Sequence, residues 1–243
     1  WFGYGINING ITEYVGFIRN GTESANGQSN VSVTNITTNM TESSLIIYGG
    51  WLCQRSFGRG TSNNVIEYCT NYADVNGPNA GGIIGGGVGY ASSSGVTIQF
   101  CTNYAAINES TSISGGGGIA GANSGSGTNT IVSLAIFISC TNYGTIGNFA
   151  GGIAGIEAGA GSVAFQENNS KATFEKCINM GNIIGILAGG ICGANSGQRT
   201  FSEKGIIIDT CINMGNINGD QAGGIVGYAG GNAGGFARVT NCG

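Results

Sequence analysis

The residues with the greatest capacity for chemistry are eight cysteines, six of which recur at one position of a repeated motif. The six are Cys69, Cys101, Cys140, Cys177, Cys211 and Cys242, and Cys53 and Cys192 lie near a second repeated block. Equivalent residues of stacked coils lie about 4.8 Å apart, within the Cα range that a disulfide allows. Two alternatives stay open, a buried ladder of free thiols or disulfides such as Cys53 with Cys69 and Cys192 with Cys211 or Cys177. No Cys-x-x-Cys occurs, so we expect no metal and no cofactor.

Two acidic residues offer a second chemistry. Glu175 and Asp209 each stand two residues before a repeated cysteine, so stacking places them about 5 Å apart on adjacent coils. That separation resembles the carboxylate pair of a retaining glycosidase. We favour the alternative, a solvated outer face with Lys176 beside the pair, and we therefore expect no enzyme activity. The chain has no histidine, which excludes His-based triads, His zinc sites and haem ligated by His.

An aromatic column stands three residues after the repeated cysteine. Its members are Tyr72, Tyr104 and Tyr143, followed by Met180 and Met214. An exposed column of this kind could stack on sugars, whereas a column of mutually stacked rings would exclude water. We favour the second reading.

Six N-glycosylation sequons point to the cell compartment. They are Asn20, Asn30, Asn35, Asn39, Asn108 and Asn168. Most would lie in loops, as glycans require, but Asn35 aligns with a repeated asparagine. Together with the even number of cysteines, the sequons predict a secreted or surface-exposed eukaryotic protein.

A repeat of 31 to 39 residues must position all these side chains. Each copy has a Cys-x-Asn motif, such as Cys69-Thr-Asn-Tyr, and a later Gly-Gly-Ile block, such as Ala80-Gly-Gly-Ile. Three short β-branched runs per copy, bounded by Gly and Asn, are typical of strands. The length varies mainly after the Gly-Gly-Ile block. The sequence therefore predicts an all-β fold, a β-solenoid of three-strand coils with about six rungs and one variable loop per rung.

The repeat also sets the domain organisation. Residues 1–32 form a degenerate N-terminal coil part and a glycosylation-prone loop, and residues 33–243 form the solenoid. Its copies start near residues 33, 65, 96, 131, 172 and 206, with a truncated coil at 236–243.

Stacking assigns a role to each repeated column. An amide ladder is expected from Asn71, Asn103, Asn142, Asn179 and Asn213. One apolar core column is expected from Ile83, Ile119, Ile153, Ile191 and Ile225, and another from Ile66, Ile98, Phe137, Phe174, Ile208 and Val239. The paired glycines suit a corner where no Cβ fits.

The composition agrees with this architecture and excludes several partners. Of 243 residues, 49 are Gly and only 8% are charged. A net charge of −4 with eight basic residues argues against nucleic acid. No run of about 20 apolar residues occurs, so no membrane span is expected.

The Gly-Gly-Ile-x-Gly block, with its upstream Cys-x-Asn-x-Gly-x-Ile, resembles the GLUG-type repeat over residues 33 to 243. That resemblance implies a β-solenoid of the kind found in large surface proteins, including adhesin-like stalks. Some relatives are metallopeptidases, but their zinc motif needs His, which is absent here.

These observations favour a structural extracellular protein, either a stalk or a filament subunit, with adhesion as a further role. The terminal coils carry no recognisable cap, so the expected partner is a second copy stacked end to end or adjoining segments of a longer chain. The alternative function is a carbohydrate-active or glycan-binding β-helix that uses Glu175 and Asp209 or the tyrosine column.

Overall fold

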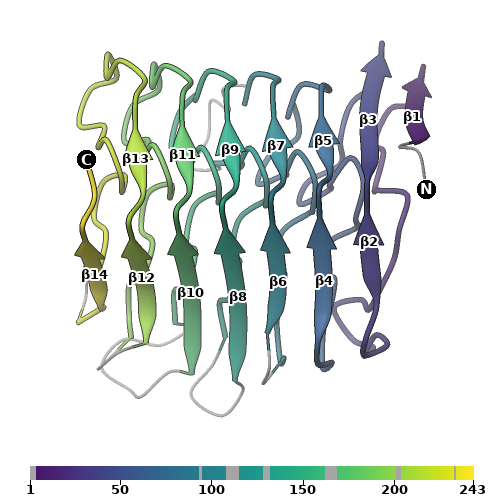
Figure 1. Cartoon of the computed structure of the whole chain (residues 1–243), viewed down its shortest axis with the longest axis horizontal. Coiled ribbons are helices and arrows are strands. Elements are labelled where there is room, and N and C mark those ends of the chain that lie inside the picture. Colours follow the sequence, from purple (N-terminus) through teal and green to yellow (C-terminus); the bar gives the residue numbers. More distant parts are fainter. Residues whose placement is uncertain are drawn as a thin grey trace.

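The computed structural model is an all-β solenoid of about six turns, which confirms the predicted fold class (Figure 1). It describes residues 4–92, 95–107, 115–127, 132–161, 169–200, 204–232 and 234–243. Two parallel sheets of seven strands run the length of the stack. Within the described residues there is no helix, and hence none that could cross a membrane.

The first sheet contains the strands that follow the repeated cysteine. In spatial order they are β1 (Tyr4–Asn9), β3 (Ile36–Thr41), β5 (Thr70–Asn71), β7 (Thr102–Asn103), β9 (Thr141–Asn142), β11 (Ile178–Asn179) and β13 (Ile212–Asn213). Most are only two residues long, because the chain turns again immediately after the asparagine.

The second sheet contains the strands that precede the cysteine. In spatial order they are β2 (Ser32–Thr34), β4 (Asn64–Glu67), β6 (Val96–Gln99), β8 (Ser133–Ile138), β10 (Ser170–Glu175), β12 (Gly205–Asp209) and β14 (Ala237–Thr240). In the inner strands β4, β6 and β8, residues alternate between buried and partly exposed, as expected for strands with one face on a core.

One left-handed residue per coil joins the two sheets. These corner residues have φ between 51° and 54° and are Tyr68, Phe100, Ser139, Lys176, Thr210 and Asn241. The backbone N–H groups of the first five donate to the neighbouring coil, as Phe100 does to the Ile138 carbonyl at 3.0 Å. The inter-coil bonds therefore hold a conformation that side chains other than glycine rarely adopt.

The expected third strand is replaced by columns of single bridges. Gly81, Gly117 and Gly151 stack in one such column, and Ile84, Ala120 and Ala154 stack in another. The Gly-Gly corner bends the chain so sharply that each coil meets the next at isolated residues. Length also varies at a second place, because the segment from Ile107 to Gly117 is four residues longer than that from Val75 to Gly81.

The main core lies between the sheets and the Gly-Gly-Ile side. Its two predicted apolar columns are buried in the inner coils, where Ile66, Ile98, Ile119 and Ile153 are fully covered. The rings of Phe137 and Phe174 stack with centroids 4.8 Å apart. In-register stacking therefore brings like side chains together and leaves no room for charge in the core.

Candidate functional site

The buried asparagines form a continuous chain of amide hydrogen bonds. Each Nδ2 in the ladder donates to the Oδ1 of the next asparagine, as Asn103 does to Asn142 at 2.8 Å and Asn142 does to Asn179 at 2.8 Å. Each Nδ2 also donates to a backbone carbonyl two residues ahead, which closes the turn after the strand. The members are Asn71, Asn103, Asn142, Asn179 and Asn213. The arrangement is a structural device, because every amide group is used within the ladder.

The ladder begins at Thr38 and not at Asn35, which corrects the sequence alignment. Thr38 pairs in register with Asn71, and its Oγ1 donates to Asn71 Oδ1 at 2.8 Å. Asn35 instead occupies the left-handed corner, with a φ of 57° and its N–H bonded to the Glu67 carbonyl. Asparagine suits that corner because its short polar side chain tolerates left-handed backbone.

All eight cysteines are free thiols, so the disulfides considered for Cys53, Cys69, Cys192 and Cys211 are not formed. In-register residues of parallel strands have parallel Cα–Cβ vectors about 4.8 Å apart, which exceeds the usual Cβ separation of a disulfide. Each ladder thiol instead donates to a backbone carbonyl, as Cys101 Sγ does to Gln99 at 3.4 Å. Burial raises the pKa values of the Cys53 and Cys192 thiols well above the ordinary value for cysteine. Both thiols therefore stay protonated.

We expect thiol labelling of the native chain at pH 8 to modify Cys242 alone. Its side chain is partly exposed, whereas the other seven are buried. In denaturant without reductant, all eight thiols should react, as intact-mass measurement would show. A denatured chain that takes up fewer than eight labels would contradict the free-thiol assignment.

The tyrosine column is exposed at its edges and covered at its faces. The rings of Tyr72, Tyr104 and Tyr143 lie nearly parallel, with centroid separations of 4.9 and 4.8 Å. Each inner ring face is therefore occupied by its neighbour, and a sugar could not lie on it. A second exposed stack, Tyr68 on Phe100, has the same geometry at 5.1 Å.

The structure brings Glu175 and Asp209 onto adjacent strands, where they are register partners. Glu175 pairs with Lys176 at 2.8 Å. Asp209 accepts hydrogen bonds from Thr240 at 2.7 Å and Asn241 at 2.9 Å, which lower its pKa. Asp209 is therefore held in its ionised form by contacts with the next coil, and Glu175 is held by Lys176.

The sequons differ in exposure. Asn30, Asn35 and Asn39 are exposed, whereas Asn20 is buried. The Asn20 side-chain amide makes two hydrogen bonds with the Gln28 backbone: Nδ2 donates to the carbonyl, and Oδ1 accepts from the N–H. A glycan on Nδ2 would break this pair. Asn108 and Asn168 lie outside the described residues.

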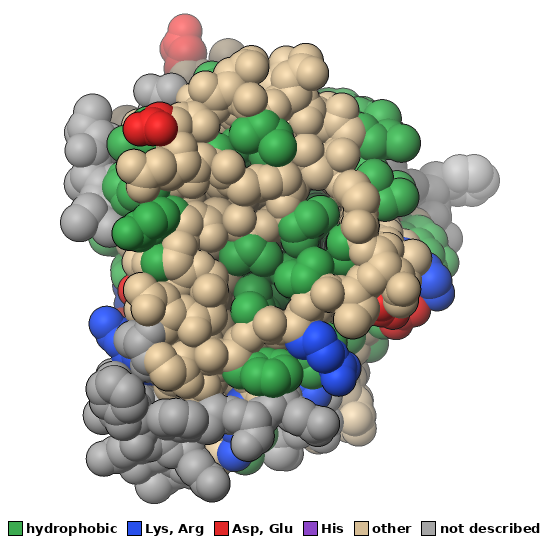
Figure 2. Space-filling view, turned by 90° about the vertical axis from the view of Figure 1, so that its left-hand side faces the viewer, with side chains coloured by type: hydrophobic (Ala, Val, Ile, Leu, Met, Phe, Trp, Pro, Cys, Tyr) green, Lys and Arg blue, Asp and Glu red, His purple; other side chains and the backbone are tan. Residues whose placement is uncertain are grey.

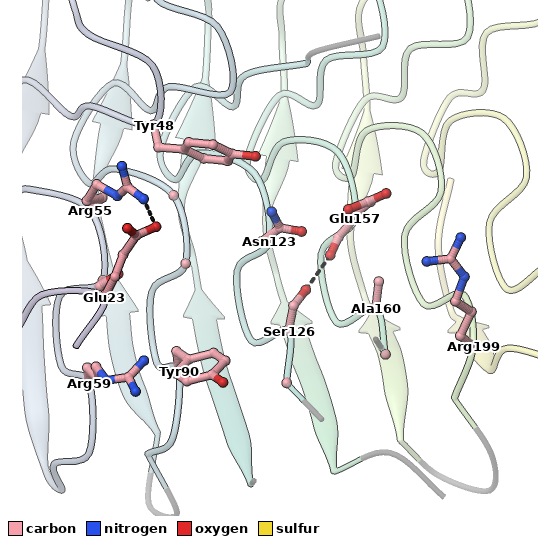
Figure 3. A pocket seen from close by; sticks show the side chains of 15 residues that line it. Glu23, Tyr48, Arg55, Arg59, Tyr90, Asn123, Ser126, Glu157, Ala160 and Arg199 are labelled. Carbon is pink, nitrogen blue, oxygen red and sulfur yellow. Dashed lines mark hydrogen bonds and ion pairs between the residues drawn. The ribbon is translucent and has the colours of Figure 1, made fainter. Parts of the chain in front are cut away.

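A polar groove that the sequence did not reveal crosses the side of the stack (Figure 3). It encloses about 450 Å³ and follows the turns after the Gly-Gly-Ile block. Arginine, tyrosine and glutamate side chains line it, namely Arg55, Arg59, Arg199, Tyr48, Tyr90, Glu23 and Glu157. These residues are not repeated from coil to coil, so a search for repeated positions passes over them. The available signal was the pair of arginines in Arg55-Ser-Phe-Gly-Arg59, within a chain that has few charges.

No family model, no curated protein and no solved structure matches the chain. In the described residues, no three His, Cys, Asp or Glu side chains gather in a way that could hold a metal ion.

Proposed function

We propose that this chain is a structural β-solenoid rod of an extracellular stalk or filament, in which further coils stack end to end on its terminal coils. One observation carries the proposal: the two ends of the stack are complementary in their strands. The GLUG-like motif adds support, since repeats of that type build surface stalks. The exposed sequons Asn30, Asn35 and Asn39 are compatible with an extracellular location.

The complementarity follows from the order of the strands. At one end the second sheet extends one strand further, with β14, and at the other end the first sheet extends one strand further, with β1 (Figure 1). Within every inner coil, a second-sheet strand leads directly into a first-sheet strand. A β14 beside the β1 of a following copy would therefore complete one coil. Tyr4 and Gly5 of that copy would have to move aside, because Cys242 and Gly243 already occupy the equivalent positions next to β13. Both sheets would then continue by parallel pairing, β14 with β2 and β13 with β1.

The core columns are open at the end of the stack that carries β14. Figure 2 shows this end, where apolar side chains gather over its middle. Ile183 is fully buried in an inner coil, whereas Ile217, next in the same column, is 48% exposed. Likewise Ile208 is buried, and Val239 beyond it is 45% exposed. A further coil would cover these side chains as the inner coils cover theirs.

We expect the purified chain to form linear assemblies whose length grows with concentration, and Ile217→Lys to weaken them by at least about tenfold. A lysine there would be buried without a partner at the junction. Ile184→Lys is the matched control, because Ile184 is 47% exposed but belongs to an inner coil. Sedimentation velocity and negative-stain electron microscopy would measure assembly.

Two results would contradict the proposal for copies of this chain. One is a parent that stays monomeric at the highest concentration reached. The other is equal weakening by both lysine variants, which would place the contact on the side of the rod.

A further inference from the structure

The polar groove gathers most of the guanidinium groups of an otherwise acidic chain. Arg55, Arg59 and Arg199 line it, and Arg19 lines a smaller hollow of about 280 Å³ that shares Glu23 and Arg55 with it. Four of the five arginines thus lie along one side of a protein whose net charge is −4.

Two of the arginines, Arg55 and Arg59, lie at one end of the groove, and each is placed over a tyrosine ring (Figure 3). The guanidinium carbon of Arg59 lies 4.5 Å from the ring centroid of Tyr90, and that of Arg55 lies 5.4 Å from the ring centroid of Tyr48. Arg55 also pairs with Glu23. Stacking on a ring fixes the plane of a guanidinium and leaves its N–H edges for an acceptor in that plane.

Arg59 has no charged partner among the described residues. Its Nε is buried with no hydrogen-bond partner in the described part of the chain. A carboxylate fits an arginine fork with two parallel hydrogen bonds. Arg59, beside Tyr90, is therefore the candidate position in the groove for a ligand carboxylate.

The floor of the groove excludes recognition by an added β-strand. Its backbone N–H groups already bond between coils, as Ser56 does to Gly86, Gly87 to Ala122 and Asn123 to Ile156, at 2.8 to 2.9 Å. A peptide would find no main-chain partners there. Side chains with hydroxyl, amide and carboxylate groups, namely Ser126, Asn123 and Glu157, instead follow the arginines along the groove (Figure 3).

We propose that this groove binds an acidic oligosaccharide, with a uronate carboxylate on Arg59 and a sugar ring against Tyr90. From the coil of Arg55 to that of Arg199 there are four steps, or about 19 Å, which suits an extended chain lying along the axis. Glu23 and Glu157 can accept hydrogen bonds from the sugar hydroxyls. The inference is independent of end-to-end assembly, because the groove lies on the side of the rod.

The test is calorimetric titration of the full chain with a short oligogalacturonate. Its methyl ester has the same rings without the charge, and we expect it to bind at least about tenfold more weakly. Arg59→Gln should cost a similar factor, and Tyr90→Leu several-fold. Arg59→Lys should recover only part of the loss, because a lysine cannot form the planar fork.

Arg238→Gln is the matched control, since it removes the same charge from the exposed strand β14. It should leave the affinity unchanged, and thermal unfolding would verify that every variant is folded. The proposal is overturned if no binding occurs, if the ester binds as well as the acid, or if Arg238→Gln weakens binding as much as Arg59→Gln. Tighter binding of heparin or polyglutamate would likewise overturn it, by showing attraction to charge alone.

Discussion

Replacing Asn142 with alanine is expected to lower the free energy of unfolding by about 5 kcal/mol. The Asn142 side chain is fully buried and makes three hydrogen bonds, to Asn103, Asn179 and the Gly144 carbonyl, each at 2.8 Å. Alanine would remove all three and leave buried donors and acceptors without partners, which costs more than the bonds themselves contribute. No water can replace the amide at a fully covered position without opening the coil.

The matched comparison is Asn213→Ala at the end of the same ladder. Asn213 is only partly buried; its Nδ2 donates to the Gly215 carbonyl at 2.9 Å, and its Oδ1 accepts from Asn179 Nδ2 at 2.7 Å. Water can reach the groups left behind, so the expected loss is about 1 kcal/mol. Urea unfolding of both variants would give the difference. A loss of only about 1 kcal/mol at Asn142 as well would mean that the ladder contributes little beyond what solvent supplies.

The same ladder explains why so much of this fold could be predicted. Stacking requires the same side chain at the same position in each coil, so Asn, Cys and Ile recur in the sequence at the spacing of one turn. The core columns through Ile66 and Ile83 followed from that recurrence alone. The third strand did not, because Gly81 and Ile84 satisfy the repeat while pairing only as single bridges.

In the degenerate first copy of the repeat, the sequence alignment places residues at the wrong positions of the coil. An asparagine at position 35 suggested a ladder position, but the ladder position belongs to Thr38, whose hydroxyl performs the amide's role. The disulfide hypothesis failed for a different reason, since spacing along the stack cannot show that neighbouring Cβ vectors are parallel.

The groove was missed because its residues occur once each. Arg59 and Tyr90 occupy equivalent turns of successive coils, yet the coil after them places Ser126 there. A recognition surface on a repeat protein consists of such departures from the repeat, whereas the columns maintain the scaffold. Column residues are found by looking for positions that repeat, whereas recognition residues are found by looking for positions that break the repeat.

Gly151→Ala is expected to destabilise the chain by more than about 4 kcal/mol. Gly151 belongs to the bridge column of the Gly-Gly corner. A Cβ at this position would lie 1.9 Å from the Ala154 carbonyl oxygen and 2.4 Å from the Gly193 nitrogen. Both are backbone atoms, one in the same coil and one in the next, so no side chain can rotate away to make room.

The cost of this substitution comes from space and not from backbone conformation, because Gly151 does not have a positive φ. Gly5→Ala is therefore the informative control, since it adds the same methyl group on the edge strand β1 where nothing lies within 4 Å. Its effect should stay within about 0.5 kcal/mol, with the loss of glycine flexibility in the unfolded chain acting in its favour. Thermal unfolding of both variants separates the two explanations. A mild effect of Gly151→Ala would mean that the coils can move apart at the corner, and the bridge column would then not set the spacing of the solenoid.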